Sequence, residues 1–124
     1  MNRRYWEERL HYLISLAERD RTPLTVVYLD IDYFKQVNDR LGHAQGDALL
    51  ESFAQRLSSI SREADLVGRW GGDEFAIAMP HSDQQQAGLL LSRLRTDLGD
   101  IGFSAGVVSL QPGESLDDLL RRAD

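Results

Sequence analysis

Residues 65–80 read Asp-Leu-Val-Gly-Arg-Trp-Gly-Gly-Asp-Glu-Phe-Ala-Ile-Ala-Met-Pro, and this stretch decides the fold. Two β-prone runs, 65–70 and 74–80, flank the pair Gly71-Gly72. Glycines between two such runs are typical of a tight hairpin, because glycine accepts backbone angles that other residues avoid. The sequence therefore predicts two antiparallel strands in the middle of the chain.

A further strand and several helices are expected around this hairpin. The run 24–29, Leu-Thr-Val-Val-Tyr-Leu, is continuously β-prone and suits a central strand that is covered on both faces. A last strand is expected over residues 101–110, and apolar residues at helical spacing predict helices elsewhere. The expected helices carry Trp6, Leu10, Leu13, Ile14 and Ala17; Phe34, Val37 and Leu41; Leu49, Leu50, Phe53, Leu57 and Ile60; Ala87, Leu90, Leu91 and Leu94; and Leu116, Leu119 and Leu120.

The order of these elements predicts the fold class. Asn2 is expected to cap the first helix, Gly42 to end the short second helix, and Ser115 to cap the last one. Helices that alternate with a strand, a hairpin and another strand predict an α/β (α+β) sandwich, in which helices flank a mostly antiparallel central sheet. We expect one domain that spans residues 1–124.

Composition excludes several classes of protein. The 124 residues are 42% hydrophobic and 27% charged, which is typical of a soluble globular domain. There is no apolar run near the roughly 20 residues of a membrane span, and no signal peptide is expected, so we predict a cytoplasmic location. The absence of cysteine excludes disulfides and thiolate sites. A net charge of −6 argues against a general nucleic-acid binder, whereas small phosphorylated ligands remain possible with a cation.

Four carboxylates stand where the predicted strands end. Asp30 and Asp32 close the first strand on one expected face, while Asp73 and Glu74 follow the Gly-Gly pair. If the hairpin packs beside that strand, the carboxylates cluster and repel one another unless a cation neutralises them. Oxygen ligands suit Mg²⁺ (or Mn²⁺), which serves phosphoryl chemistry. Aspartate at a strand end is also a common turn residue or helix cap, so the carboxylates alone leave both interpretations open.

The segment 71–75, Gly-Gly-Asp-Glu-Phe, resembles the signature of the GGDEF family. The rest of that family's pattern follows at the expected distances over essentially the whole chain. The resemblance implies a fold similar to nucleotidyl cyclase and polymerase-palm domains. It also implies diguanylate cyclase activity, which is the metal-dependent condensation of two GTP into cyclic di-GMP with release of pyrophosphate. The matching segments are residues 2–4, 30–35, 38–39, 42–43, 46–47, 69–70 and 104–107.

The resemblance assigns roles to individual residues. It implies that Asp30, the carbonyl of Ile31, Asp73 and Glu74 hold divalent metal, with Asp73 and Glu74 as the catalytic pair. In the family, the position of Glu74 also helps to deprotonate the attacking 3′-hydroxyl. The implied GTP-binding residues are the backbone of Tyr33, Phe34 and Lys35 for the phosphates, Asn38 and Asp47 for the guanine edge, and Gly71 and Gly72 for close backbone approach. The side chains of Phe34 and Phe75 are expected to pack in the core.

A second ligand site is implied by Arg62-Glu63-Ala64-Asp65, which matches the family's inhibitory product site. An arginine can hold a phosphate or a guanine edge through two donors, and Arg93 is a candidate second contributor. The competing interpretation is an ordinary surface ion pair between Arg62 and Asp65. The spacing predicts a product site that is well separated from Gly71.

The sequence departs from the family pattern at both ends. Only the tail of the opening motif is present, and Ala123-Asp124 resembles the start of the closing helix, whose phosphate-contacting lysine and arginine are absent. Three functions stay open: an active cyclase, a GTP- or cyclic di-GMP-binding module without turnover, and a non-catalytic interaction domain. The intact carboxylates favour the first function, the missing tail favours the second, and an intact signature disfavours the third. Catalysis implies a homodimer, because each domain binds one GTP.

Overall fold

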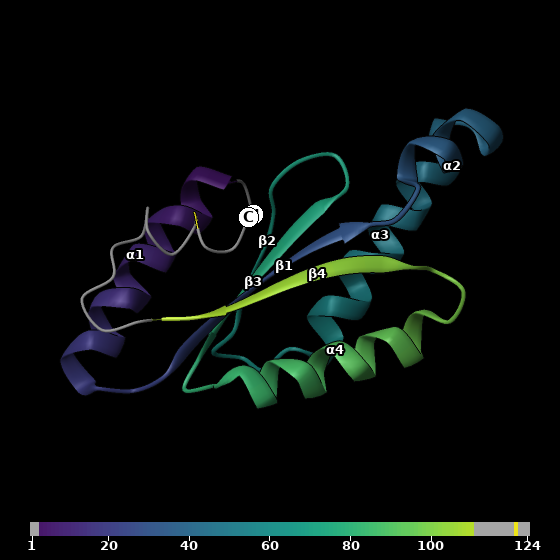
Figure 1. Ribbon diagram of the computed structural model, residues 1–124. Helices are drawn as coiled ribbons and strands as arrows, with labels where there is room; N and C mark the ends of the chain where they lie inside the picture. Colours follow the sequence, from purple (N-terminus) through teal and green to yellow (C-terminus); the bar gives the residue numbers. More distant parts are fainter. Residues whose placement is uncertain (1–2, 111–120, 122–124) are drawn as a thin grey trace.

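The computed structural model describes residues 3–110 and residue 121. The helices and strands of this part of the chain follow one another in the order that the sequence predicts (Figure 1). The expected cap at Asn2 and the expected helix after Ser115 lie outside the described residues. The elements are α1 (Arg3–Asp20), β1 (Leu24–Ile31), α2 (Phe34–Leu41), α3 (His43–Ile60), β2 (Leu66–Arg69), β3 (Glu74–Pro80), α4 (Gln84–Leu98) and β4 (Phe103–Ser109).

The four described strands form one sheet in the order β2-β3-β1-β4. Each neighbouring pair is antiparallel, so the predicted antiparallel sheet is confirmed. β1 lies in the interior of the sheet, which fits its continuous apolar sequence. The register places Asp30 opposite Glu74 on β3 and opposite Ser104 on β4. The C-terminal end of β1 and the start of β3 therefore meet at one end of the sheet.

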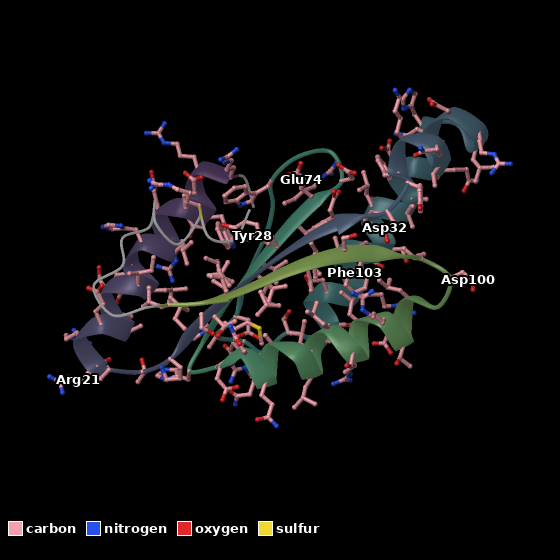
Figure 2. All side chains as sticks on the ribbon, in the orientation of Figure 1. Arg21, Tyr28, Asp32, Glu74, Asp100 and Phe103 are labelled. Carbon is pink, nitrogen blue, oxygen red and sulfur yellow. The ribbon has the colours of Figure 1, made fainter. Side chains whose placement is uncertain are left out.

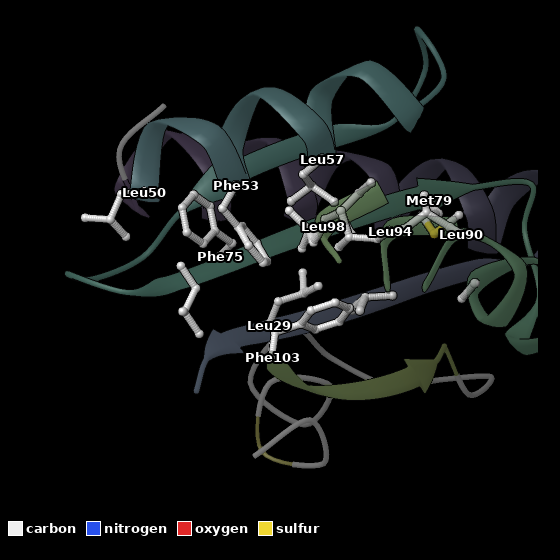
Figure 3. Close-up of a cluster of buried hydrophobic side chains, with 14 residues drawn as sticks. Leu29, Leu50, Phe53, Leu57, Phe75, Met79, Leu90, Leu94, Leu98 and Phe103 are labelled. Carbon is white, nitrogen blue, oxygen red and sulfur yellow. The ribbon is translucent and has the colours of Figure 1, made fainter. Parts of the chain in front are cut away.

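Helices cover both faces of the sheet, which confirms the predicted sandwich. Alternate residues of β1 point to opposite faces, so Val27 and Leu29 enter one core while Leu24 and Val26 enter the other. The first core contains residues of α3 and α4, with the Phe53 ring between the other two aromatic rings of the cluster (Figure 3). The second core lies between α1 and the other face of the sheet. α2 projects beyond the end of the sheet and packs against α3 (Figure 1).

Trp6 attaches α1 to the edge strand β2. Its ring is fully buried, and its indole N–H donates to the carbonyl of Leu66 at 3.1 Å. Gly68 makes this contact possible, because a Cβ at that position would lie 2.5 Å from Cδ1 of Trp6. Trp6 also meets the rings of Tyr28 and Trp70 edge-on, at centroid distances of 6.2 and 5.4 Å. The aromatic cluster therefore fixes α1 beside the strand that leads into the Gly-Gly turn.

Gly68→Ala is expected to lower the free energy of unfolding by about 1–3 kcal/mol, because the added methyl group overpacks against Trp6. Urea unfolding followed by tryptophan fluorescence measures this change. Gly88→Ala is the matched control, since a Cβ there meets nothing within 4 Å and alanine is the better residue inside α4. Equal stability of the Gly68 and Gly88 variants would contradict the packing argument.

The hairpin differs in one respect from the expected tight turn. Trp70 N–H donates to the carbonyl of Glu74 at 2.8 Å, which leaves the three residues 71–73 as the loop. The positive-φ glycines of the described chain are Gly42 and Gly99, so the turn glycines do not adopt the angles from which the hairpin was predicted. What distinguishes Gly71 and Gly72 in this turn is therefore their lack of a side chain. Gly42 does end α2, with φ of 90°, and its N–H donates to the Asn38 carbonyl at 2.9 Å.

Candidate functional site

The candidate site lies where β1 ends and the hairpin turns. Asp30 is the penultimate residue of β1 and pairs across the strands with Glu74, the first residue of β3. The backbone N–H of Ile31 donates to the carbonyl of Asp73 at 3.2 Å, and the Asp73 carboxyl group lies within hydrogen-bonding reach of Asp30. Figure 2 shows Glu74 and Asp32 at this end of the sheet. The predicted gathering of carboxylates is therefore observed.

The carboxylates raise the proton affinity of Asp30. Partial burial, the hydrogen bond with Asp73, and the charges of Asp73, Glu74 and Asp32 raise the pKa of Asp30 to about 6. Asp30 is nevertheless an exposed residue, so its burial is only partial. Within the described part of the chain, none of these four residues forms an ion pair with an arginine or lysine. The cluster therefore carries negative charge that a cation would neutralise.

The donor set fits a divalent cation that is shared with a ligand. Among residues 3–110 and 121, no group of three or more histidine, cysteine, aspartate or glutamate side chains is arranged to hold a metal ion by itself. Mg²⁺ typically binds through one or two carboxylates and completes its coordination with water and substrate phosphates. Asp30, Asp73 and the carbonyl of Ile31 supply oxygen donors of this kind. The arrangement suits an ion that arrives with a phosphorylated ligand.

Asp32 has a different environment from Asp30. The sequence predicted that Asp30 and Asp32 share a face, because side chains alternate along a strand. β1 ends at Ile31, however, so this alternation does not apply to Asp32. Its N–H donates to the carbonyl of Gly102 at 3.0 Å, and its Oδ1 accepts from the Ser104 hydroxyl at 2.7 Å. Asp32 thus ties the turn after β1 to β4. Sequence reasoning missed Ser104 in this role, although the residue lies in a recognised motif segment.

The residues expected at the nucleotide phosphates follow β1 directly. Tyr33 is 77% exposed and has φ of 57°, in the left-handed region. Phe34 begins α2, and its side chain packs against the core, as predicted for it and for the buried Phe75. Only the backbone of Phe34 therefore remains for a ligand. The Lys35 side chain is exposed on the first turn of α2.

The residues expected at the guanine edge come together where α2 meets α3. A Cβ on Gly46 would overlap Oδ1 of Asn38, so the Asn38 side chain lies directly against the backbone of α3. Asp47 follows Gly46 and is exposed. A pocket of about 400 Å³ is bordered by Asp47 and by Arg69 of β2. Its full lining is Asp47, Leu50, Glu51, Ala54, Arg69 and Phe75.

A second pocket, of about 430 Å³, lies on the α1 side of the sheet. Asp30, Glu74 and Ser104 provide polar groups in its wall, and Tyr28 and Trp70 provide aromatic ones. Phe75 borders this pocket as well as the one beside Asp47. Phe75 thus stands between two concave surfaces, a form that suits a ligand with a base and a charged tail.

The residues of the expected product site lie at the opposite end of the sheet. Arg62 donates through Nη2 to Asp65 Oδ1 at 3.1 Å, to the Pro80 carbonyl at 2.7 Å and to the Ser82 hydroxyl at 2.6 Å. Pro80 ends β3, whose first residue is Glu74, so the two sites are a strand length apart. Arg93 is exposed on α4 and has no described contact with Arg62 or Asp65.

The comparison with known proteins decides the family. A family model described as "Diguanylate cyclase, GGDEF domain" matches residues 1–124. The chain belongs to the GGDEF family. It is 34% identical over 134 residues to "Diguanylate cyclase DgcP" of Pseudomonas aeruginosa, which covers 99% of this chain and 20% of that protein.

Solved structures agree with the fold of this GGDEF domain. It superposes with a TM-score of 0.94 on the GGDEF domain of DgcB from Caulobacter crescentus, crystallised with c-di-GMP, at 29% identity over 99% of this chain and 80% of that one. The active GGEEF domain of a diguanylate cyclase from Vibrio cholerae gives a TM-score of 0.93, at 32% identity over 99% and 85% of the two chains. The predicted palm-like cyclase fold is thereby confirmed.

The chain spans about a fifth of the length of DgcP and 30% of "Response regulator PleD" of Caulobacter vibrioides, to which it is 34% identical over 137 residues. Of the helices that the structure describes, none combines the length and the apolarity that a membrane crossing needs.

Proposed function

We propose that this GGDEF domain is a diguanylate cyclase, which joins two GTP molecules into cyclic di-GMP and releases pyrophosphate. The observation that carries the proposal is the cluster of Asp30, Asp73 and Glu74, which gathers negative charge and raises the pKa of Asp30 to about 6. Such a cluster fits a divalent ion bound together with a triphosphate. The diguanylate cyclase names of the relatives support the same activity.

In this proposal the carboxylates have two roles, at the phosphates of one GTP and at the attacking 3′-hydroxyl of the other. Asp30, Asp73, Glu74 and the Ile31 carbonyl would hold Mg²⁺ or Mn²⁺. When bound there, the ion would supply positive charge to the phosphate oxygens of GTP. Glu74 accepts the proton of the attacking 3′-hydroxyl. The 3′-oxygen then forms a bond to the α-phosphorus of the other GTP while the bond to pyrophosphate breaks, and the reciprocal step closes the ring.

Recognition of GTP is assigned to the elements on either side of the carboxylates. Asp47 accepts the N1 and N2 hydrogens of guanine, and Asn38 bonds another atom of the guanine edge. The backbone from Tyr33 through Phe34 to Lys35 lies along the phosphates. Gly71 and Gly72 leave room for the nucleotide, since a Cβ on Gly72 would meet nothing within 4 Å and one on Gly71 only Glu74.

The reaction requires two domains. Each domain binds one GTP, so a homodimer must place two sites opposite each other. GTP is consumed in the cytoplasm, and we place the domain there. Incubation of the 124-residue chain with GTP and Mg²⁺ or Mn²⁺, followed by chromatography, tests the proposal. Cyclic di-GMP and pyrophosphate are the expected products. Binding of GTP without products would instead support the alternative, a regulatory module without turnover.

Product inhibition at Arg62 and Asp65 is part of the proposal. In the described chain, the hydrogen bonds of the Arg62 side chain all come from Nη2, so Nε and Nη1 remain for a ligand. The Arg62 side chain is 50% exposed, whereas that of Asp65 is 1% exposed. A guanidinium held on one side and open on the other suits a phosphate or guanine edge. Arg93, on the exposed surface of α4, is the candidate second contact.

Arg62→Ala and Ser82→Ala are expected to separate the two roles of this arginine. Both variants lose hydrogen bonds around the β3–α4 connection, so each should lower the free energy of unfolding by about 1–2 kcal/mol. Only Arg62→Ala removes the proposed ligand contact, so only it should weaken cyclic di-GMP binding, by about tenfold or more. Calorimetric titration and thermal melts measure both quantities. If the affinity for cyclic di-GMP is unchanged in Arg62→Ala, the ion pair between Arg62 and Asp65 has only a structural role.

A further inference from the structure

Among the side chains that the structure describes, that of Arg69 holds the Gly-Gly turn. Arg69, the last residue of β2, donates through Nε to the carbonyl of Gly71 at 3.0 Å and through Nη2 to the carbonyl of Gly72 at 2.8 Å. We name this pair of hydrogen bonds the Arg69 fork. The guanidinium is planar, so its two donors fix the relative orientation of the two carbonyl groups. Two successive peptide groups are therefore oriented by one residue.

The turn has little else to hold it. Gly71 and Gly72 carry no side chains, both are exposed, and glycine has the greatest backbone freedom of any residue. Trp70 N–H closes the loop on the Glu74 carbonyl at 2.8 Å, and Ile31 N–H donates to the Asp73 carbonyl at 3.2 Å, so neither of these bonds involves the two glycines. Charge-assisted bonds such as those of the Arg69 fork are stronger than neutral ones. The fork supplies the restraint that the glycines lack.

The position of Asp73 depends on this restraint. Asp73 directly follows the Gly72 carbonyl that Arg69 holds. Its own carbonyl accepts from Ile31 N–H at 3.2 Å, and its carboxyl group lies within hydrogen-bonding reach of Asp30. Rotation of the Gly72–Asp73 peptide would move both of these contacts. Arg69 thus contacts the peptide that precedes Asp73, a candidate metal ligand, and is not itself a candidate ligand.

We propose that Arg69 is a positioning residue of the catalytic site, which orients the Gly71-Gly72 peptides and thereby places Asp73 beside Asp30. The assignment rests on the proposed cyclase function for its effect on turnover. Its structural effect is independent of that function. Arg69 also borders the pocket beside Asp47, where its guanidinium could contact a bound nucleotide directly. Positioning and direct contact with the nucleotide differ in their kinetic signatures.

The first test follows the turn in the metal-free protein. Hydrogen exchange of the Ile31 amide, measured by NMR, reports on its bond to Asp73. Arg69→Ala should accelerate this exchange about tenfold or more, while the Val27 amide in the middle of β1 exchanges as in wild type. Arg69→Lys keeps the charge but cannot present two donors in one plane, so it should fall between the two. Unchanged exchange at Ile31, or an equal acceleration at Val27, would overturn the proposal.

The second test uses GTP with Mn²⁺. Arg69→Ala should lower kcat about 10–100-fold, the range typical of residues that orient metal ligands, and change KM for GTP by less than about threefold. Arg56→Ala, an exposed arginine on α3, is the matched control and should behave as wild type. An effect confined to KM would mean direct contact with the nucleotide and would overturn positioning. A wild-type chain without turnover would refute the proposed function, and the Ile31 exchange would still decide the role of Arg69.

Discussion

Asp30→Asn is expected to lower the affinity for GTP in the presence of Mg²⁺ about 100-fold or more. Asp30 lies at the centre of the carboxylate cluster and is the proposed metal ligand of β1. An outer residue that only orients a metal ligand is worth about 10–100-fold in metal affinity or in activity, and a direct ligand is worth at least as much. Calorimetry with a non-hydrolysable GTP analogue, with and without Mg²⁺, measures the loss. Equal affinity of variant and wild type would remove Asp30 from the metal site.

The pKa of Asp30 adds a dependence on pH. A proton and a cation compete for the carboxylate, so metal-dependent GTP binding should weaken as the pH falls through about 6. In the metal-free protein the sign is opposite for stability. The folded state binds this proton more tightly than the unfolded state, so stability is lost as the pH rises from about 4 to about 6. Asp30→Asn should remove this loss.

Folding controls follow from the same linkage. At pH 7.5 without metal, Asp30→Asn should melt at a temperature equal to or above that of wild type, because it removes repulsion with Asp73 and Glu74. Asp97→Asn, an exposed aspartate of α4, is the matched control and should bind GTP as wild type does. A lower melting temperature of Asp30→Asn would show that the carboxylate stabilises the fold, against the arrangement described here.

Glu74→Gln is expected to lower turnover about 10²–10⁴-fold, the range of a lost general base. Glutamine keeps an oxygen beside Asp30 but does not accept a proton from the 3′-hydroxyl. Metal-dependent GTP affinity should therefore fall by less than about tenfold, in contrast to Asp30→Asn. Production of cyclic di-GMP by chromatography and binding of the GTP analogue by calorimetry give the two values.

Glu18→Gln, an exposed glutamate of α1, controls for the loss of one negative charge elsewhere on the domain. Wild-type turnover in Glu74→Gln would assign proton removal to another group. Loss of GTP binding as complete as in Asp30→Asn would make Glu74 a metal ligand first.

Much of the fold was predictable from local patterns. The β-prone run 24–29 became the interior strand β1, and apolar residues at helical spacing became the buried faces of α1, α3 and α4. These predictions succeed because the periodicity of a helix or strand is repeated within a few residues. The tight turn at Gly71-Gly72 was predicted for the wrong reason, since neither glycine has a positive φ. A turn's backbone angles depend on what holds it, and here Arg69 does.

The sequence by itself determined the element order, the antiparallel hairpin and the motif that identifies the family. Only the tertiary structure decided how the motif residues are held. Ser104 reaches Asp32 across 72 residues, and Trp6 fits over Gly68 because β2 lies beneath α1. The raised pKa of Asp30 likewise arises from partial burial and from Asp73 and Glu74, which the β1–β3 register brings beside it. Periodicity is a local property of the chain, whereas a contact between distant residues exists only after the helices and strands have packed.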